Sequence, residues 1–212
     1  MQRDEVWDEA VRVVRGDVRG LVPVREDLTR RWSEAHRGYH DLRHLDEVVA
    51  ASGTLRVDSL DTDGDRAVVA LAAWFHDAVY DPAAPTDNER LSAMLARETL
   101  SVHGVDRAAV ETVASLVEAS ADHVVTQDRG PHAVFHDADL WIFSAPEDRF
   151  DEYCADVRRE YASVPDDAYA HGRSAILAPF LDRPSVYRTA LARRDWEPAA
   201  RANLSRELRR LR

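Results

Sequence analysis

The sequence of 212 residues predicts an all-helical fold, and three of its features lead to that prediction. Apolar residues recur at helical spacing almost throughout, and long runs that alternate apolar and polar residues are missing. Glycine and proline residues stand between the apolar segments, where turns are expected. These breaks divide the chain into about ten helices of ordinary length. Because one hydrophobic core is workable at this length, residues 1–212 are expected to form a single domain.

The amino-terminal part of the chain contains the two helical segments with the plainest boundaries. Helical spacing opens at Val6, and a helix over residues 3–18 is expected there. A strongly apolar run from Ala67 to Tyr80 predicts a buried helix, which Asp63 or Asp65 would cap. Because every side chain from Ala67 to Phe75 is apolar, the helix should lie in the core.

Helix starts and one loop can also be assigned in the second half. Thr86 or Asp87 is expected to start the helix that follows the apolar run. The stretch from Asp122 to His132 predicts a loop between two helices. Ser144 precedes Pro146 and Glu147, a pattern typical of a helix start.

Composition and charge exclude several functional classes. The 39 acidic and 28 basic residues give a net charge of -11, which disfavours nucleic-acid binding. All the basic residues are arginine, so any phosphate-binding side chain with a fixed charge must be an arginine. With one cysteine, Cys154, and no secretory signal or apolar run of membrane length, we expect a cytoplasmic protein without membrane contact.

Three histidines four residues apart form the first candidate site element. His36, His40 and His44 would share one face if their segment were helical, and two imidazoles on one face can bind one metal ion. The spacing alone is equally compatible with a solvated helix start. It therefore needs support from other parts of the chain.

A His-Asp dipeptide at the end of the apolar helix gives that support. His76 and Asp77 follow the buried run directly, so their side chains would lose water, and burial of an unpartnered carboxylate is costly. A divalent cation removes this cost, because it accepts imidazole nitrogen and carboxylate oxygen together. The alternative is that the pair only caps the helix before Asp81 and Pro82.

The His-Asp dipeptide is repeated at His136 and Asp137, so the dipeptide alone does not identify the site. The segment continues to Asp139 and is expected to open a helix. Two aspartates two residues apart diverge by about half a turn on a helix, so only one of them should face a metal. Only His76-Asp77 follows a strongly apolar run.

Together these motifs resemble the HD-domain superfamily of metal-dependent phosphohydrolases, whose ligands follow the order His, His-Asp, Asp on separate helices. More narrowly, the chain is similar to the predicted metal-dependent HD phosphohydrolases of bacteria, which implies an HD-type helical bundle with a core over about residues 31–207 and the helix 3–18 as an appendage. The resemblance rests on these motifs: Tyr39-His40-x-x-x-His44, Phe75-His76-Asp77-x-x-Tyr80-Asp81-Pro82, Asn88-Glu89-x-x-Ser92-Ala93, Asp137-Ala138-Asp139-Leu140, Val157-Arg158-x-Glu160-Tyr161, Tyr169-x-x-Gly172-Arg173 and Ala199-x-x-Asn203-Leu204.

The resemblance also implies roles for single residues. The expected ligands of the divalent metal, which could be Mn, Mg, Fe, Ni, Co or Zn, are His44, His76, Asp77 and Asp139. His40 would be an additional ligand or a neighbour that faces the pocket. Asp137 would cap the helix or orient a ligand, with an additional metal or pocket role as the other possibility. His123 corresponds to a position that binds substrate or a second metal in some members.

The expected function is hydrolysis of a small phosphorylated substrate such as a nucleotide, with water activated by the metal. Asp77 is the first candidate for the base, and His123 or Glu89 is the alternative. Arg37 and Arg173 are the expected partners of the phosphoryl charge, chosen from a set that also contains Arg43 and Arg90. Tyr80 is expected to contribute to substrate binding.

Two other functions fit the same pattern. Some HD-fold proteins hold two irons and oxidise their substrate, which here would require His40 and His123 as further ligands. A regulatory module that binds a metal or nucleotide without catalysis is the third possibility. The sequence is compatible with a monomer or a homodimer and does not identify the substrate or the metal.

Overall fold

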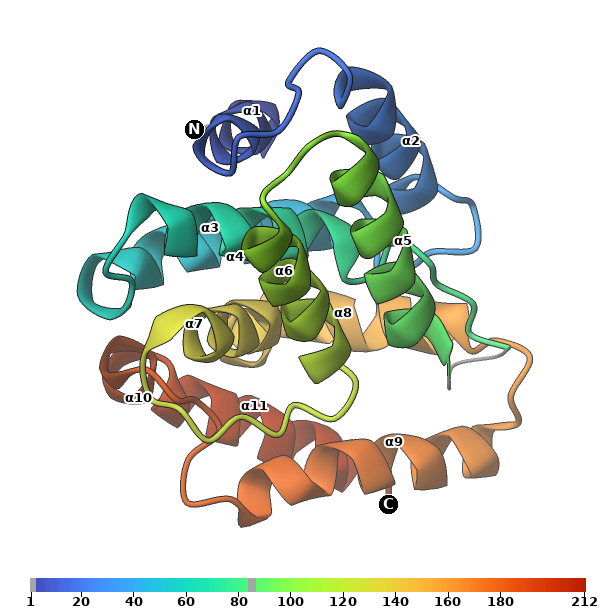
Figure 1. The fold of residues 1–212 in the computed structure, drawn as a ribbon. Helices are drawn as coiled ribbons and strands as arrows, with labels where there is room; N and C mark the ends of the chain where they lie inside the picture. The colour runs from blue at the N-terminus through green and yellow to red at the C-terminus, as the bar shows by residue number, and fades with distance from the viewer. Residues whose placement is uncertain (1–2, 84–86) are drawn as a thin grey trace.

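The computed structural model describes residues 3–83 and 87–212. For residues 57–58, within the first of these ranges, it describes the backbone but not the side chains. Figure 1 shows that the described part of the chain is all-helical, as predicted. It contains eleven α-helices and one 3₁₀ helix: α1 (Arg3–Val13), α2 (Val22–Trp32), α3 (Leu42–Ser59), α4 (Asp63–Phe75), α5 (Asn88–Val102), α6 (Arg107–Ala119), α7 (Gly130–Asp139), η2 (Leu140–Ser144), α8 (Glu147–Glu160), α9 (Asp166–Asp182), α10 (Ala190–Asp195) and α11 (Glu197–Arg210).

Helix α4 forms the centre of the bundle. Its residues from Ala67 to Phe75 are all buried, and it contacts α1, α3, α5, α6 and α7. A helix that is apolar on every side is stable only when other helices surround it. Thr62 caps its start, in a capping box with Asp65, in place of the predicted caps Asp63 or Asp65. The helix ends at Phe75, so His76 and Asp77 leave it inside the protein.

Helix α1 is shorter than the predicted helix over residues 3–18, and it is part of the core. It ends at Val13, two residues before Arg15, whose φ of 62° does not fit a right-handed helix. Trp7 is 1% exposed and packs edge-on against Trp74, with ring centroids 5.3 Å apart. One hydrophobic cluster therefore includes side chains from this first helix through to α11.

The start of α3 agrees with the second interpretation of the three histidines, a capped helix start, and not with a shared helical face. Asp41 caps the helix by accepting hydrogen bonds from the backbone N–H groups of Arg43 (2.8 Å) and His44 (3.2 Å). The helix begins at Leu42, so only the last histidine is helical, whereas His36 and His40 lie in the turns before it. A Cβ added at Gly38 would lie 2.4 Å from a backbone oxygen of α8, and this close approach fixes the turn.

Two further boundaries differ from the prediction. His136, Asp137 and Asp139 end helix α7 and do not open a helix, so the loop predicted over 122–132 is instead residues 120–129. The helix after the apolar run was predicted to start at Thr86 or Asp87. Thr86 lies outside the described residues, and Asp87 directly precedes α5. Glu147 begins α8 as expected, although no side chain caps that helix.

Helix α9 lies along one side of the bundle, opposite α1, and contacts α11 (Figure 1). One face of this helix, between Ala168 and Phe180, lines a cavity that is described below. The lining residues on this face recur every three or four positions. Among the described residues, we find no helix with the length and apolar character that crossing a lipid bilayer requires.

Candidate metal centre

Four side chains from three helices converge at the inner end of α4. The Nε2 atoms of His44 and His76 lie 3.2 Å apart. Asp139 Oδ1 lies 3.3 Å from the first of these nitrogens and 3.4 Å from the second. His44, His76 and Asp139 thus form a group that could hold a metal ion, since their ligand atoms all lie within 4.8 Å of one another.

The carboxylate of Asp77 borders this group. Its Oδ2 lies 3.1 Å from Nε2 of His76 and 3.8 Å from Nε2 of His44. All four residues that the sequence predicted as ligands are therefore brought together. They come from separate elements: the first turn of α3, the C-terminal end of α4 and the last residue of α7.

The separations suit one shared ion. Ligand atoms about 2.1 Å from a common cation lie about 3.0 Å apart at right angles and about 3.4 Å apart in a tetrahedron. The contacts between the two imidazoles and Asp139, from 3.2 to 3.4 Å, match these values. Two imidazole nitrogens with carboxylate oxygens suit a first-row divalent ion such as Mn, Fe, Co, Ni or Zn.

Packing fixes the orientation of His76. Its Nδ1 donates a hydrogen bond of 2.9 Å to the carbonyl oxygen of Ala73, one turn earlier in α4. With the proton on Nδ1, the lone pair of Nε2 faces the cluster, as a ligand requires. The rings of Trp32 and Phe135 pack on the imidazole, with centroids 5.3 and 5.6 Å away.

The two carboxylates and His76 influence one another strongly. Burial disfavours the charged carboxylates, yet the pKa values of Asp77 and Asp139 lie below their usual values because of the His76 imidazole. Burial likewise opposes a charged His76, but its pKa is raised because Asp77 and Asp139 face it. The cluster thus favours positive charge at its centre, which a divalent cation provides.

Asp137 does not belong to this cluster, and its suggested metal or pocket role was wrong. Its side chain is fully buried and accepts hydrogen bonds from Arg188 N (2.8 Å), Thr189 N (2.7 Å) and Thr189 Oγ1 (2.8 Å). His136 Nδ1 lies 2.9 Å away and acts as a further donor. The carboxylate anchors the segment between α9 and α10, and it is not among the residues that line the cavity.

A second buried carboxylate, Glu160, organises the turn before α3. Its Oε1 accepts hydrogen bonds from the backbone N–H groups of Gly38, Tyr39 and His40, at 2.8 to 2.9 Å. Its Oε2 lies 2.8 Å from both His40 Nδ1 and the hydroxyl of Tyr80. Although burial raises the pKa of Glu160, these donors, with His40 first, lower it to about 2.

Glu160 is a site residue that the sequence reasoning missed. It occurs in one of the motifs that carry the family resemblance, but its partners lie about 120 positions earlier in the chain, so spacing gives no sign of its role. His40 borders the cluster as predicted, with its Nδ1 directed to Glu160. Tyr80, predicted to contribute to substrate binding, lines the cavity, and its hydroxyl donates to Glu160.

Arg37 is not placed to bind a substrate, contrary to the prediction. Its side chain has no exposed surface, and its guanidinium lies between Trp32 (5.4 Å) and Tyr80 (5.3 Å). Its Nη1 donates to the carbonyl oxygen of His40 at 2.8 Å, and its Nε donates to Glu34. Arg37 therefore stabilises the turn that carries His40, and it does not line the cavity.

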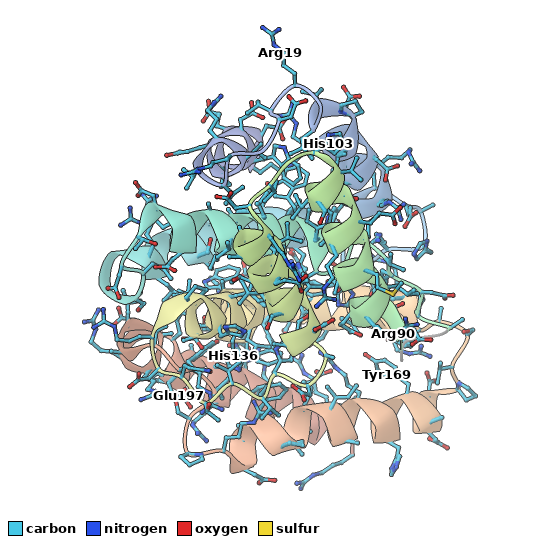
Figure 2. All side chains as sticks on the ribbon, viewed as in Figure 1. Arg19, Arg90, His103, His136, Tyr169 and Glu197 are labelled. Carbon is cyan, nitrogen blue, oxygen red and sulfur yellow. The ribbon has the colours of Figure 1, made fainter. Side chains whose placement is uncertain are left out.

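A cavity of about 540 Å³ opens next to the cluster, a volume suited to a small molecule. Its lining includes the four candidate ligands and the other predicted residues Glu89, His123 and Arg173. His123 Nε2 lies 4.0 Å from Asp139 Oδ2, on the side away from the two imidazoles. In Figure 2 the labelled Tyr169 lies on the side of α9 that faces the start of α5, and residues of both helices line the cavity.

Two of these residues have pKa values suited to proton transfer. Burial raises the pKa of Glu89, and the nearby carboxylate of Asp77 adds to the increase. Burial lowers the pKa of His123 to about 4, so its imidazole is neutral near pH 7. Asn88 positions Glu89, because its side chain makes two hydrogen bonds to the backbone of Asp81 in the loop after α4.

Comparison with known proteins identifies no relative: no family model, no curated protein and no solved structure matches the chain.

Proposed function

We propose that this protein is a metal-dependent phosphohydrolase of the HD type, acting on a small phosphorylated substrate such as a nucleotide. The observation that carries the proposal is the cluster of two imidazole nitrogens and two carboxylates at one wall of a cavity. The order of these residues along the chain is the order that the resemblance to HD phosphohydrolases implies. The cavity leaves room for a substrate beside the cluster.

His44, His76, Asp77 and Asp139 would hold the ion, through the four atoms that face one another. A divalent cation bound there supplies Lewis-acid activation of a water molecule and of a phosphoryl oxygen. The protein contributes fixed ligand positions, because Ala73 orients His76 and the capped start of α3 orients His44. These residues need little rearrangement for binding, which lowers the cost of forming the site.

Three residues could take the proton from the attacking water. Asp77 stays ionised because its pKa is low, and its second oxygen is free to accept a hydrogen bond from water when one oxygen binds the ion. Glu89 and His123 are the alternatives, and each lines the same cavity. Glu89 has a raised pKa, which makes it a stronger base than an ordinary carboxylate.

Turnover by the metal-loaded protein tests the proposal. The purified chain is stripped with a chelator, reloaded separately with Mn, Mg, Fe, Ni, Co or Zn, and incubated with nucleotides and sugar phosphates while released phosphate is measured. We expect hydrolysis that depends on the added ion and that His44→Ala abolishes. Arg90→Ala, which changes an exposed arginine on α5, is the matched control and should retain the rate.

Stoichiometric metal binding without hydrolysis of any substrate would contradict the proposed activity. Equal hydrolysis by the wild type and by His44→Ala would also contradict it, because the cluster would then have no part in the reaction.

A two-metal oxygenase is the second candidate, and the position of His123 favours it. Asp139 has Oδ1 near the two imidazoles and Oδ2 near His123 Nε2, so its carboxylate could bridge two ions. Elemental analysis separates the two functions. Two irons per chain with a visible absorption band would favour the oxygenase, and one ion per chain would favour the single-metal hydrolase.

A further inference from the structure

Arg173, on α9, is a buried cation with unused hydrogen-bonding capacity. It is 8% exposed, and neither its Nε nor its Nη2 has a hydrogen-bond partner among the residues that the structure describes. The same described part of the chain provides no carboxylate within 4.0 Å of its guanidinium. Because burial of an unpaired charge is costly, a ligand that provides the missing partner would stabilise this arrangement.

Two tyrosines complete the surroundings of Arg173. The guanidinium lies over the Tyr153 ring, 4.8 Å from its centroid. Tyr169 stands one helical turn before Arg173 on α9, and its buried hydroxyl also has no partner among the described residues. Burial raises the pKa of Tyr169 to about 12, while the charge of Arg173 opposes the increase, so the two groups are close. The hydroxyl therefore remains protonated and can donate.

Two aromatic rings lie between this group and the metal centre. Tyr153 packs edge-on against Tyr39, with centroids 4.5 Å apart, and Tyr39 lies 4.5 Å from the imidazole of His44. Neither Asp77 nor Asp139 makes an ion pair with Arg173 in the described part of the chain. One cavity thus has a metal centre and a separate group of donors, and both sets of residues line it.

Apolar side chains also line the cavity, and its charge is unbalanced. Phe143, Val157, Ile176, Leu177 and Phe180 line it between and beside the two polar groups. Among the described lining residues, Arg173 carries the only fixed positive charge. A ligand held at both ends must therefore match a metal at one end and a cation with hydroxyl donors at the other.

We propose that Arg173 and Tyr169 form an anion-binding subsite, and that the substrate is a phosphate ester whose leaving group carries a second anionic group on an apolar or aromatic body. The placement of the ester at the metal centre rests on the proposed function, whereas the anion-binding subsite does not. Guanidinium N–H groups pair with a carboxylate or a phosphate through parallel hydrogen bonds, and the Tyr169 hydroxyl adds a third. The second anion would select the substrate, and the metal centre would act on its ester.

Binding to the metal-free protein tests the subsite without any turnover. Protein treated with EDTA is titrated calorimetrically with benzoate, with its neutral counterpart benzamide, and with inorganic phosphate. We expect benzoate or phosphate to bind about tenfold or more tightly than benzamide, which is the order expected for a buried charge-assisted pair. The anion that binds more tightly identifies the second group of the substrate as a carboxylate or a phosphate.

Two variants separate a binding role from a structural role. Arg173→Met should remove the preference for the anion and leave the unfolding temperature of the ligand-free protein unchanged or higher, because it removes an unpaired buried charge. Tyr169→Phe keeps the ring and should weaken anion binding by a smaller factor. Arg90→Ala is the control and should bind anions like the wild type. Unchanged anion binding by Arg173→Met, or a large loss of its stability, would overturn the subsite.

Turnover of a matched pair of esters links the subsite to the reaction. Phenyl phosphate and 4-carboxyphenyl phosphate differ only in the second anion. We expect the metal-loaded wild type to prefer the carboxylated ester in kcat/KM by about tenfold or more, mainly through KM, and Arg173→Met to lose this preference. Equal loss on both esters would show that Arg173 binds the transferred phosphoryl group, which contradicts the proposal. Anion binding without turnover of either ester would retain the subsite and contradict the proposed hydrolysis.

Discussion

Two of the chain's three His-Asp dipeptides lie at the C-terminal ends of helices, and the structure gives these two opposite roles. His76-Asp77 ends α4 beside a cavity, whereas His136-Asp137 lies near the end of α7 in the interior. Backbone and hydroxyl donors surround the carboxylate of Asp137. The contacts found for Asp77 in the described residues are instead to imidazole nitrogens that could share a metal ion.

The difference shows how a functional carboxylate is distinguished from a structural one. A buried carboxylate requires donors or a cation, because its desolvation is costly. Where the protein supplies the donors, as at Asp137, the residue stabilises the fold. Where the neighbours are mainly other side chains that can bind a metal, as at Asp77 and Asp139, the cation that offsets the desolvation must come from outside the protein.

Asp139→Asn should show the largest effect, on metal affinity. The exchange keeps the size of the side chain and removes its charge from the three-residue cluster with His44 and His76. We expect metal affinity to fall by more than about 100-fold, beyond the usual effect of losing a partner outside the ligand shell. Titration of the stripped variant with Mn or Zn measures this. Tight stoichiometric binding by this variant would remove Asp139 from the site.

Asp137→Asn, two residues earlier, should instead destabilise the fold. The carboxylate now accepts hydrogen bonds from N–H and O–H donors, and the amide would place its own N–H₂ group against some of these donors. We therefore expect a loss of about 3–5 kcal/mol in the free energy of unfolding. Denaturant unfolding of the metal-free protein gives the value. Folded protein of this variant should still bind the wild-type amount of metal, and a variant that is stable but loses its metal would contradict the comparison.

Glu160→Gln tests whether Glu160, a carboxylate that protein donors surround, stabilises the fold as Asp137 does. The pKa of Glu160 falls from 4.5 to about 2 in the folded protein, so its contribution is present above pH 4.5 and is lost as the pH falls toward 2. We expect the variant to lose about 3 kcal/mol at pH 7, with a smaller difference from the wild type at pH 3. Unfolding curves at both pH values measure the difference. A constant difference between pH 7 and pH 3 would show that the charge is not the cause.

Tyr80→Phe should have the smallest effect, because it removes one of the five donors around Glu160 and keeps the ring. We expect a loss of about 1.5 kcal/mol in stability, the lower end of the range for one hydrogen bond to a charged group. Metal content should not change, and elemental analysis of the folded variant checks this. A loss of metal would place the Tyr80 hydroxyl in the metal centre.

Local patterns predicted the helical class, and the family resemblance implied the members of the central cluster. An apolar run followed by His-Asp places that dipeptide at the buried end of a helix wherever the run packs. Of the two interpretations of the three histidines, the capped helix start was right, because Asp41 caps a helix that begins after His40.

Other site features depend on contacts between distant segments, which spacing does not encode. Asp137 is structural because residues 188–189 reach it, and Glu160 orders the turn at residues 38–40. Arg37 and Arg173 are both arginines near motif residues, yet one is enclosed by Trp32 and Tyr80 and the other faces the cavity. Only the packing of α2, α8 and α9 separates these cases.

Anomalous diffraction from crystals loaded with Mn or Zn tests the central claim most directly. We expect one strong peak at the metal's absorption edge, about 2.0–2.2 Å from Nε2 of His44, Nε2 of His76 and a carboxylate oxygen of both Asp77 and Asp139. A fully loaded crystal with its peak elsewhere, and with the two imidazoles directed away from each other, would contradict a shared metal centre.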